Sequence, residues 1–413
     1  MRYENVKGTR DFNPEEMEKR KYIIDVIRKT FEEFGFVEID TPCLEKWDVL
    51  SKKGAGGEGI LEETYKFEDK SKALIGLRYD LTVPLARFVA MNKKLPLPFK
   101  RYQIGKVWRY GDISKGRLRE FLQADIDIVG ADSILADAEV LACASSALKK
   151  LKIDFLIRIN SRKILNSIMK KAGIKNELVI DALRSIDKLD KISEDEVKKE
   201  LFSKGFGKEV VEKIFEMIKS KPEELKIDGI EELNKLSDYL KLYGINNFKI
   251  DFSLARGLDY YTGPIFEIVS KERIGSIAGG GRYDNLIELF SSEKIPATGI
   301  SLGIERIFEI LKEYPKKKRI FVALSTEDVF EDAIKIVKML REKFYVDYDL
   351  KGRKLSKQME YADAAGFSIV VIVGKKDLEN NEVTVRDMES GNEKKIKIKD
   401  LESFLENFKF KEH

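Results

Sequence analysis

Apolar residues near the start of the chain recur with the period of an amphipathic helix. Four of them share one predicted helical face: Ile24, Ile27, Phe31 and Phe34. Asn13 followed by Pro14 is typical of an N-cap and the first helical position. A helix is therefore expected over residues 14–34. The extended segment after it should end near Pro42 or lie at a sheet edge, because proline cannot donate to a strand ladder.

The pattern changes to a period of two between residues 100 and 128. Alternating residues carry the larger apolar side chains over Tyr102–Tyr110 and again over Leu122–Ile128. The stretch Gly111–Gly116 between them is rich in turn-forming residues. Two alternating segments around such a stretch predict a long antiparallel hairpin.

Later segments add further strands and helices. A second hairpin is expected over residues 249–269, and a strand followed by a helix over residues 277–311. Residues 161–244 are instead rich in Lys, Glu and Leu and predict several short amphipathic helices. Together these segments indicate an α+β fold, in which an antiparallel sheet is flanked by helices and interrupted by a helical insertion.

The C-terminal part alternates strands and helices after a charged, proline-containing linker at residues 312–319. Its expected order is a strand at 320–324, a helix near 329–344, a strand at 345–348, a helix near 356–364 and a strand at 367–373. This order predicts a separate α/β domain over residues 319–413.

Composition limits the chemistry that this chain can perform. Its 413 residues are 43% hydrophobic and 36% charged, and no apolar run reaches membrane-spanning length, so a folded protein without a membrane anchor is expected. The net charge of +4 is too small to identify a polyanionic partner. Cys43 and Cys143 form no CxxC motif, which fits a reducing cytoplasm. Because His413 is the single histidine, a histidine-activated nucleophile and a histidine-ligated metal are excluded, and no metal ligands are identified.

The first predicted hairpin concentrates positive charge. Residues 100–119 contain seven basic side chains and one acid, Asp112, which a solvated hairpin face would explain equally well. Arg109 could nevertheless hold a phosphate through both ends of its planar fork. On the return strand, Gln123 and Asp127 share a side and lie roughly 13 Å apart, so they could face one elongated polar ligand. Polar residues on a solvent-facing side are the more common outcome.

Two later segments could also contact a ligand. Tyr260 and Tyr261 lie in a glycine-bounded segment with Arg256, and such groups suit a small zwitterionic or anionic ligand, although a hairpin turn with surface aromatics is the alternative. Gly279–Gly281 form no known phosphate-binding fingerprint and are a weak signal. Arg306 lies off the apolar face of its predicted helix, where a plain surface arginine is the more common outcome.

Taken in order, these segments resemble the histidyl-tRNA synthetases, a family of class II aminoacyl-tRNA synthetases. The most specific segment is Arg256–Gly263, which resembles the histidine-specific peptide of this family. One departure concerns motif 2, in which an acid usually follows two residues after the arginine. Here Gly111 holds that position and Asp112 comes next, so the acid that contacts ATP is left open. The remaining segments that carry the resemblance are Lys7–Phe12, the helix and strand that end at Pro42 (motif 1), Arg78–Pro84 as a substrate-binding strand, Trp108–Arg109 with Arg117–Phe121 (motif 2), and Gly299–Arg306 (motif 3).

The resemblance implies a homodimeric enzyme that activates L-histidine with ATP and Mg²⁺ and transfers it to tRNA-His. Asp80 and Thr82 would hold the α-ammonium of the substrate, and Gln123 would also contact the amino acid. Asp127 and Tyr261 would read the imidazole. The full set implied for histidine binding is Asp80, Thr82, Gln123, Asp127, Arg256, Tyr260 and Tyr261.

For ATP, the resemblance implies that Arg109 and Arg256 are the catalytic residues and contact the α-phosphate from opposite sides. Phe121 would stack on adenine, and Arg306 would meet adenine or the γ-phosphate. The full set implied for ATP binding is Arg109, Arg117, Arg119, Glu120, Phe121 and Arg306.

The same resemblance assigns a role to each predicted domain. Residues 1–160 and 245–312 would form the catalytic core, residues 161–244 the helical insertion near the acceptor stem, and residues 319–413 the anticodon-binding domain. One alternative is the non-catalytic, synthetase-like regulatory subunit of ATP phosphoribosyltransferase. Such proteins typically lack the C-terminal domain and part of the tyrosine-containing peptide, and this chain has both. Another class II synthetase with a similar C-terminal domain is disfavoured by the same peptide, and no editing domain is inferred.

Overall fold

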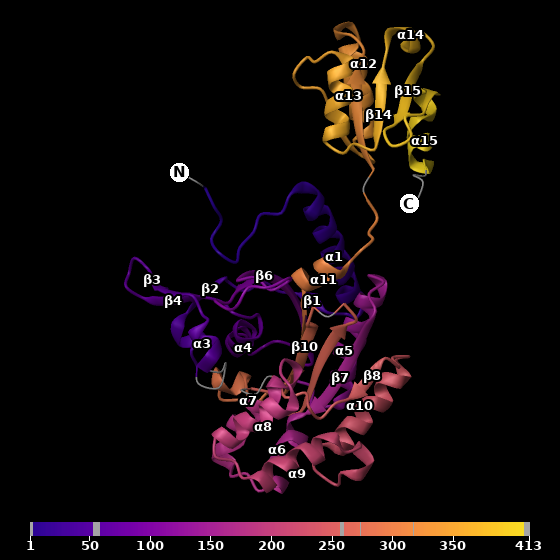
Figure 1. Ribbon diagram of the computed structural model, residues 1–413. Coiled ribbons are helices and arrows are strands. Elements are labelled where there is room, and N and C mark those ends of the chain that lie inside the picture. Colours follow the sequence, from indigo (N-terminus) through magenta and orange to yellow (C-terminus); the bar gives the residue numbers. More distant parts are fainter. Residues whose placement is uncertain (1–2, 53–57, 257–259, 273, 317, 409–413) are drawn as a thin grey trace. The chain divides into compact units, whose positions relative to one another are not determined.

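The computed structural model describes residues 3–52, 58–256, 260–272, 274–316 and 318–408 (Figure 1). They belong to two compact units, Met1–Tyr314 and Pro315–His413, and each unit is described by itself. The first unit contains every residue implied for histidine or ATP binding.

The predicted N-terminal helix is confirmed as α1 (Pro14–Glu33). Asn13 and Glu16 form a capping box, since the backbone N–H of each donates to the side chain of the other at 2.9 Å. The apolar face is rotated slightly from the expected one: Ile23 and Ile27 are fully buried, whereas Ile24 is only half-buried.

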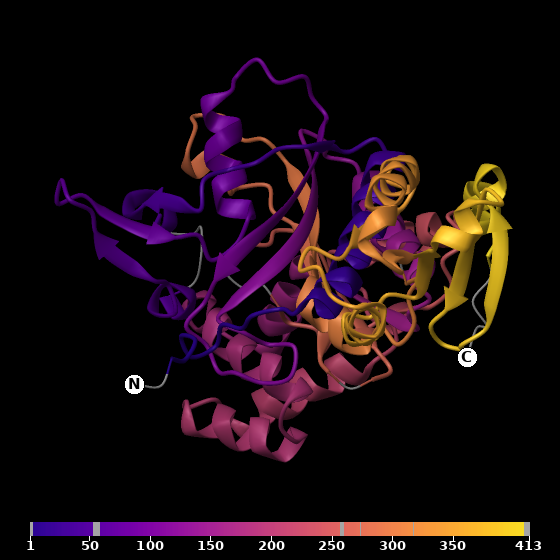
Figure 2. The same ribbon diagram turned by 90° about the horizontal axis from the view of Figure 1, so that it is seen from above.

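Within the described residues of the first unit, eight strands form one sheet that carries the site. The long hairpin is confirmed, because β5 and β6 pair antiparallel from Phe99 opposite Val129 to Trp108 opposite Glu120 (Figure 2). The edge strand β1 runs parallel to β5 and ends before Pro42, as predicted. In spatial order the strands are β1 (Val37–Glu38), β5 (Phe99–Trp108), β6 (Glu120–Val129), β11 (Ala297–Gly303), β10 (Ser276–Arg282), β9 (Pro264–Ser270), β7 (Phe155–Ser161) and β8 (Phe248–Ile250).

The second predicted hairpin is wrong. β8 and β9 do not pair with each other, because β7 lies between them, parallel to β8 and antiparallel to β9. Parallel neighbours need a long crossover, and the helical stretch between β7 and β8 provides it. The expected strand before the last helix of this unit is in fact two strands, β10 and β11, which precede α11 (Ile304–Ile310).

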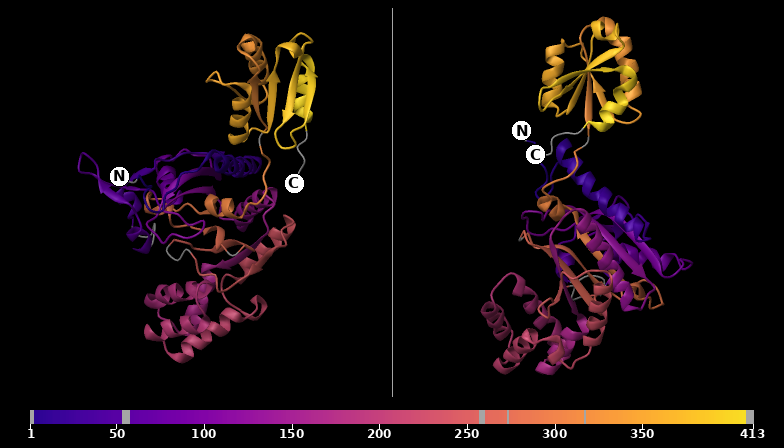
Figure 3. Two further views of the ribbon diagram at one scale, coloured as in Figure 1. Left: turned by 45° about the horizontal axis from the view of Figure 1, so that its top comes forward. Right: turned by 90° about the vertical axis from the view of Figure 1, so that its right-hand side faces the viewer.

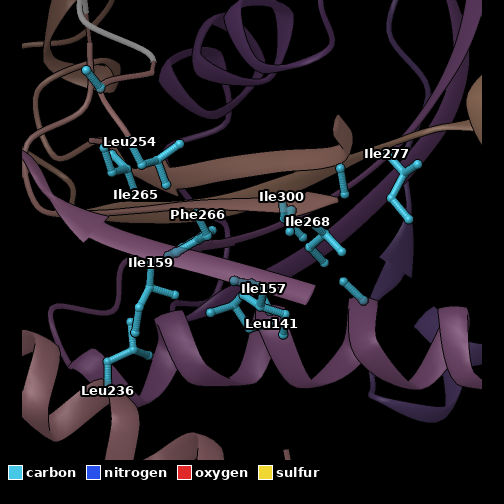
Figure 4. Packing of buried hydrophobic residues seen from close by; sticks show 14 of the residues in the cluster. Leu141, Ile157, Ile159, Leu236, Leu254, Ile265, Phe266, Ile268, Ile277 and Ile300 are labelled. Atoms are coloured by element: carbon cyan, nitrogen blue, oxygen red, sulfur yellow. The ribbon is translucent and has the colours of Figure 1, made fainter. Parts of the chain in front are cut away.

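The helices of the crossover pack into the same hydrophobic core as the sheet. Leu141 of α5 and Leu236 of α10 lie beneath Ile157 and Ile159 of β7 (Figure 4). The short helices predicted for this stretch are confirmed, whereas the boundaries 161–244 of a separate insertion stay a prediction. These helices and the neighbouring α5 are α5 (Ile134–Lys150), α6 (Arg162–Ala172), α7 (Val179–Ile186), α8 (Glu194–Ser203), α9 (Lys208–Lys219) and α10 (Ile230–Leu242).

A smaller sheet in the described part of this unit has the strand order β2 (Leu44–Lys46), β4 (Leu74–Leu77) and β3 (Lys66–Glu68). It is accompanied by α2 (Trp47–Leu50), α3 (Glu58–Glu62) and α4 (Thr82–Met91). The prediction of a strand over Arg78–Pro84 is wrong, because β4 ends at Leu77 and α4 begins at Thr82. Asp80 lies in the turn between them, and its Oδ1 accepts a hydrogen bond from the backbone N–H of Val83 at 3.0 Å. The turn occurs here because this carboxylate satisfies a free donor in the first turn of α4.

The C-terminal unit confirms the predicted alternation and adds an antiparallel pair. Among its described residues, β13, β12 and β14 are parallel neighbours, and β15 and β16 continue the sheet antiparallel. Helices cover both faces of this sheet, with α12 and α15 on one face and α13 on the other (Figure 3). The bounds are β12 (Arg319–Leu324), α12 (Phe330–Leu340), β13 (Tyr345–Tyr348), α13 (Leu355–Ala364), β14 (Ile369–Val373), α14 (Lys375–Leu378), β15 (Glu382–Asp387), β16 (Glu393–Lys397) and α15 (Leu401–Asn407).

The α+β class is confirmed by these two units. In the ranges that the structure describes, the helices are either too short or too polar to cross a bilayer.

Candidate active site

A cavity of about 860 Å³ lies on one face of the large sheet. Alternate residues of β6 explain which face: Ala124, Ile126 and Ile128 point into the hydrophobic core, and the residues between them line the cavity. A volume of this size suits a small-molecule ligand or cofactor. The residues implied for histidine or ATP binding that line it are Asp80, Thr82, Arg109, Arg117, Phe121, Gln123, Asp127, Arg256, Tyr260, Tyr261 and Arg306.

One end of the cavity contains Asp127, which has protein partners on both oxygens. Oδ1 accepts a hydrogen bond from the hydroxyl of Tyr283, and Oδ2 lies 2.7 Å from Nη2 of the fully buried Arg101. Gly299 of β11 is directly opposite Asp127 of β6, and a Cβ on Gly299 would lie only 2.0 Å from Oδ1 of Asp127. Burial raises the pKa of Asp127, and Arg101 and Tyr283 oppose that rise. The carboxylate is therefore fixed in place by its surroundings.

Two more buried carboxylates line the cavity. Burial raises the pKa of Asp80 to about 6 and that of Asp125 to about 7. Arg109 and then Arg101 favour the ionised form of Asp80, and Arg101 favours that of Asp125. Asp125 lies between Gln123 and Asp127 on the same side of β6, and Gln123 donates from Nε2 to the hydroxyl of Ser301 at 2.9 Å. The i, i+2, i+4 spacing could have identified Asp125. Acids gathered around one arginine favour a ligand that brings positive charge and N–H donors.

Aromatic side chains form a wall beside these acids. The ring centroids of Tyr260 and Tyr261 are 4.7 Å apart in an edge-to-face arrangement, and those of Tyr260 and Tyr283 are 6.1 Å apart. Burial raises the pKa of all three hydroxyls, which therefore stay protonated and can donate. Gly257–Asp259, which belong to the histidine-specific peptide, lie outside the described residues.

Guanidinium groups also line the cavity. Arg109 donates from Nε to the carbonyl of Tyr79 at 2.8 Å and lies 5.4 Å from the ring centroid of Phe121. Arg306 donates from Nη1 to the carbonyl of Ser276. Burial lowers the pKa of Arg306, and the positive charges of Arg256, Arg117 and Arg109 lower it further. Four arginines close enough to influence one another form a site for a highly charged anion.

Arg119 and Glu120 are the two implied ATP-binding residues that do not line the cavity. The guanidinium of Arg119 lies 3.6 Å from the ring centroid of Tyr110, and its side chain packs against Gly8. Glu120 accepts a hydrogen bond from Nε1 of Trp108 at 3.0 Å and pairs with Nζ of Lys106. These contacts hold the β5–β6 hairpin and the N-terminal segment together.

The structure places one acid beside Gly111 that the sequence analysis did not identify. Asp112 does not line the cavity, but Glu63 does. A Cβ on Gly111 would lie 3.2 Å from Oε1 of Glu63 and 3.2 Å from Nη2 of Arg117, and Glu63 also accepts a backbone hydrogen bond from Tyr110 at 2.7 Å. Glu63 follows α3, so only the folded chain brings it to this position.

The described residues do not form a metal cage. They contain no group of three or more His, Cys, Asp or Glu side chains that could hold an ion. Glu305 lines the cavity, but its two oxygens already meet Arg20 and the backbone N–H of Leu122. An ion that arrives bound to a polyphosphate needs few protein ligands.

Comparisons with known proteins identify the family of this chain. Residues 8–307 match the family model described as histidyl-tRNA synthetase, and residues 316–408 match that of the anticodon binding domain. A Bacillus cereus protein named histidine–tRNA ligase 1 is 39% identical over 98% of this chain and 100% of its own length. A Pyrococcus horikoshii protein named histidine–tRNA ligase is 40% identical over 98% of this chain and 99% of its own.

Two solved structures are similar to this chain over most of its length. That of histidyl-tRNA synthetase from Nostoc sp. PCC 7120 has a TM-score of 0.87 and 30% identity, covering 98% of this chain and 99% of its own. A Bacillus halodurans structure described as an ATP phosphoribosyltransferase regulatory subunit/histidyl-tRNA synthetase has a TM-score of 0.77 and covers 90% of this chain and 98% of its own. Because that protein is only 22% identical, it shows the shared fold alone.

Proposed function

The chain belongs to the histidyl-tRNA synthetase family, and we propose that the cavity between Arg109 and Arg256 is where it activates its amino acid. The enzyme joins L-histidine to ATP, giving histidyl-adenylate and pyrophosphate, and then transfers the histidyl group to the 3′ end of tRNA-His. The observation that carries the assignment of the site is that Arg109 and Arg256 line the same cavity as Tyr260, Tyr261 and Asp127.

Histidine binds at the acidic end. Asp80, Thr82 and Gln123 receive the α-ammonium side of the substrate, and Asp127 and Tyr261 read the ring nitrogens, with Tyr260 against the ring. Two observations support this assignment. Both oxygens of Asp127 are held by protein partners, Tyr283 and Arg101, and the tyrosine hydroxyls remain protonated. An analogue without ring nitrogens leaves these buried groups unpaired, a penalty that can reach about 10⁴ to 10⁵ in selectivity without editing.

Adenylate formation needs no general base, because the carboxylate of histidine is already ionised. One of its oxygens attacks the α-phosphorus of ATP, a new O–P bond forms, and pyrophosphate leaves with the electrons of the broken bond. Arg109 and Arg256 neutralise the charge that develops on the phosphate oxygens. In the second step the terminal ribose hydroxyl of the tRNA attacks the carbonyl carbon of the adenylate, and AMP leaves.

The remaining ATP contacts are assigned along the arginine end. Phe121 stacks on adenine, Arg306 and Arg117 meet the nucleotide, and Glu63 supplies a carboxylate beside Gly111. Arg119 and Glu120 act by fixing the hairpin that carries Arg109 and Phe121. Mg²⁺ would arrive bound to the phosphates of ATP and would supply positive charge there.

The tRNA is bound by other parts of the chain. Residues 319–413 recognise the anticodon, which the match to the anticodon-binding family supports. Residues 161–244 form an insertion that lies near the acceptor stem, and residues 1–160 and 245–312 form the catalytic core. The two cysteines of the chain, Cys43 and Cys143, are both free thiols, which supports a cytoplasmic location.

The active form is a homodimer that uses the motif 1 region. One support is that β1 is an edge strand of the large sheet. The other is a set of exposed apolar side chains, Val37 on β1 and three in the small sheet, Leu44, Phe67 and Leu74. Light scattering should give twice the mass of one chain, and a monomer at micromolar concentration would contradict the dimer.

Histidine-dependent exchange of pyrophosphate into ATP tests the function directly. Exchange with histidine and tRNA-His charging are expected. No exchange would favour the alternative, a non-catalytic regulatory subunit of ATP phosphoribosyltransferase, and faster exchange with a different amino acid would favour another class II synthetase.

A further inference from the structure

Glu267 is a buried carboxylate held between two arginines. It lies on β9, and its side chain is 2% exposed. Oε1 lies 2.7 Å from Nε of Arg256, and Oε2 accepts a hydrogen bond from Nη1 of Arg158 at 2.7 Å. Arg158 is directly opposite Glu267 in the β7–β9 register, so this second contact is set by the sheet itself.

Arg158 extends the network to the crossover helices. Its Nη1 also donates to Oδ2 of Asp190 at 2.8 Å, and its Nε donates to Oδ2 of Asp251 at 2.8 Å. Asp190 ends the 3₁₀ helix η2 (Asp187–Asp190), which lies within the helical stretch between β7 and β8. An unbroken series of charged contacts therefore runs from Asp190 through Arg158 and Glu267 to Arg256.

Arg256 needs such an anchor more than a core arginine does. The side chain of Arg256 is 44% exposed. A Cβ on Gly279 of β10 would lie 3.6 Å from Nη1 of Arg256, so the guanidinium lies beside a strand position that has no side chain. Without an anchor, this long side chain would sample many rotamers. Glu267 engages Nε and leaves the N–H groups of both Nη atoms able to donate to an anion.

Charge repulsion makes the anchor more important. The positive charges of Arg256, Arg109 and Arg117 all act on the half-buried Arg306. Before a nucleotide binds, like charges at close range favour conformations in which the mobile arginine turns away. A buried carboxylate beside Arg256 offsets this repulsion and keeps the group in place.

We propose that Glu267 is a positioning residue that orients Arg256 toward the α-phosphate, and that Arg158 and Asp190 connect this orientation to the crossover helices. The proposal rests on the proposed function. It identifies a determinant of the adenylation rate. Because Glu267 itself lines the cavity, its loss must act through Arg256 and leave the KM for histidine unchanged if it positions that arginine and does not bind the substrate.

The test is a double-mutant cycle in the full-length chain, read out by histidine-dependent pyrophosphate exchange. Glu267→Gln keeps the shape of the side chain but removes its charge. It should lower kcat at least about tenfold while the KM for histidine stays within about twofold. In the Arg256→Ala background the same substitution should change kcat by less than about twofold, because the group it positions is gone.

Glu45→Gln is the matched control. Glu45 is also a buried glutamate paired with an arginine, Arg87, and it does not line the cavity. It should lower thermal stability without a comparable fall in kcat. Wild-type kcat in Glu267→Gln, or an equal loss with and without Arg256, would overturn the proposal.

Asp190→Asn tests the connection to the crossover helices. A fall in kcat of about threefold that disappears in the Arg256→Ala background is expected, since Asp190 acts two contacts away. An unchanged kcat would contradict the proposed connection between the crossover helices and Arg256. If the wild-type protein shows no exchange with histidine, the proposed function itself fails, and this outcome is distinct from a failure of Glu267.

Discussion

Arg109 and Arg256 line the same cavity, and each is held through its Nε. Arg109 donates from this atom to the carbonyl of Tyr79 at 2.8 Å, and Nε of Arg256 lies 2.7 Å from Glu267. One arginine follows β5 and the other precedes β9, so the sheet brings together two groups that are far apart in sequence. Both Nη atoms of each guanidinium are therefore left for the proposed contacts with phosphate.

Replacing Arg109 with alanine should slow adenylation. We expect kcat for pyrophosphate exchange to fall by about 10² to 10³, by analogy with the loss of one oxyanion donor. Arg119→Ala, which removes an arginine of the same hairpin outside the cavity, should cost less than about tenfold, because its effect is indirect. Equal losses would contradict a direct role for Arg109.

Asp127→Asn should damage histidine recognition. Its two oxygens accept from Tyr283 and pair with Arg101, and an amide would present N–H groups to one of these donors. We expect kcat/KM for histidine to fall by about 10² or more, corresponding to the loss of a charged hydrogen bond. The KM for ATP should change little.

Asp137→Asn is the control for that variant. Asp137 is a fully buried carboxylate paired with Arg282 outside the cavity lining. It should reduce stability while leaving the KM for histidine near its wild-type value. A matching rise in KM would show that the effect of Asp127 comes from general destabilisation.

The pH dependence of histidine binding follows from Asp80 and Asp125. Burial raises their pKa values to about 6 and about 7, above the values in an unfolded chain. At these two carboxyls the ligand-free fold binds more protons than the unfolded chain, so their contribution to the free energy of unfolding should fall as the pH rises from about 4 to 7. The α-ammonium of histidine favours ionised Asp80, so affinity for histidine should rise as the pH rises through about 6.

Calorimetric titration of histidine between about pH 5.5 and 8 measures this effect, a range set by the ordinary pKa of imidazole near 6.5. Because the ring of histidine titrates identically in every experiment, the comparison with Asp80→Asn isolates the contribution of the protein. The variant should show a weaker rise in affinity, and an unchanged slope would exclude Asp80 as its source.

Glu63→Gln should weaken ATP binding. Its carboxylate lies next to Gly111 and Arg117 in the cavity, where we propose that ATP binds. We expect the KM for ATP to rise about tenfold, as for one lost charge-assisted hydrogen bond, with the KM for histidine unchanged. Asp112→Asn should change neither constant. The opposite pattern would identify Asp112 as the acid that contacts ATP.

Removal of residues 316–413 should separate the two steps of the reaction. The first unit retains its own hydrophobic core, so exchange should stay within about threefold of the full chain. Charging of tRNA-His should fall by about 10² or more and lose much of its salt sensitivity, because phosphate contacts are lost with the second unit. Equal losses in both assays would indicate a purely structural role.

Local sequence patterns predicted the elements that depend on local interactions. The helix after Asn13 and the hairpin around Gly111–Gly116 follow from capping and alternation, which are properties of neighbouring residues. The second hairpin was wrong because pairing depends on distant segments: β7 separates β8 from β9. No property of residues 249–269 themselves shows this.

The site residues divide in the same way. The resemblance brought attention to Arg109, Arg256 and the tyrosines, but burial and register were needed to find the groups that hold them. Arg101 was one of seven basic residues in a charged stretch, yet it is fully buried beside Asp127. Glu267 had no sequence signal at all, because its importance comes from the register opposite Arg158.

The parallel pairing of β7 with β8 has a consequence for how the chain matures. Ile157 pairs with Phe248 across the whole helical crossover, whereas Trp108 pairs with Glu120 across a short loop. Closing the larger loop costs more entropy, and β8 cannot be added until the ribosome has released everything before it. The β5–β6 hairpin, whose loop contains Arg109, can therefore form early in biosynthesis, whereas Arg256 and Arg306 follow β8 in the chain and reach the cavity late.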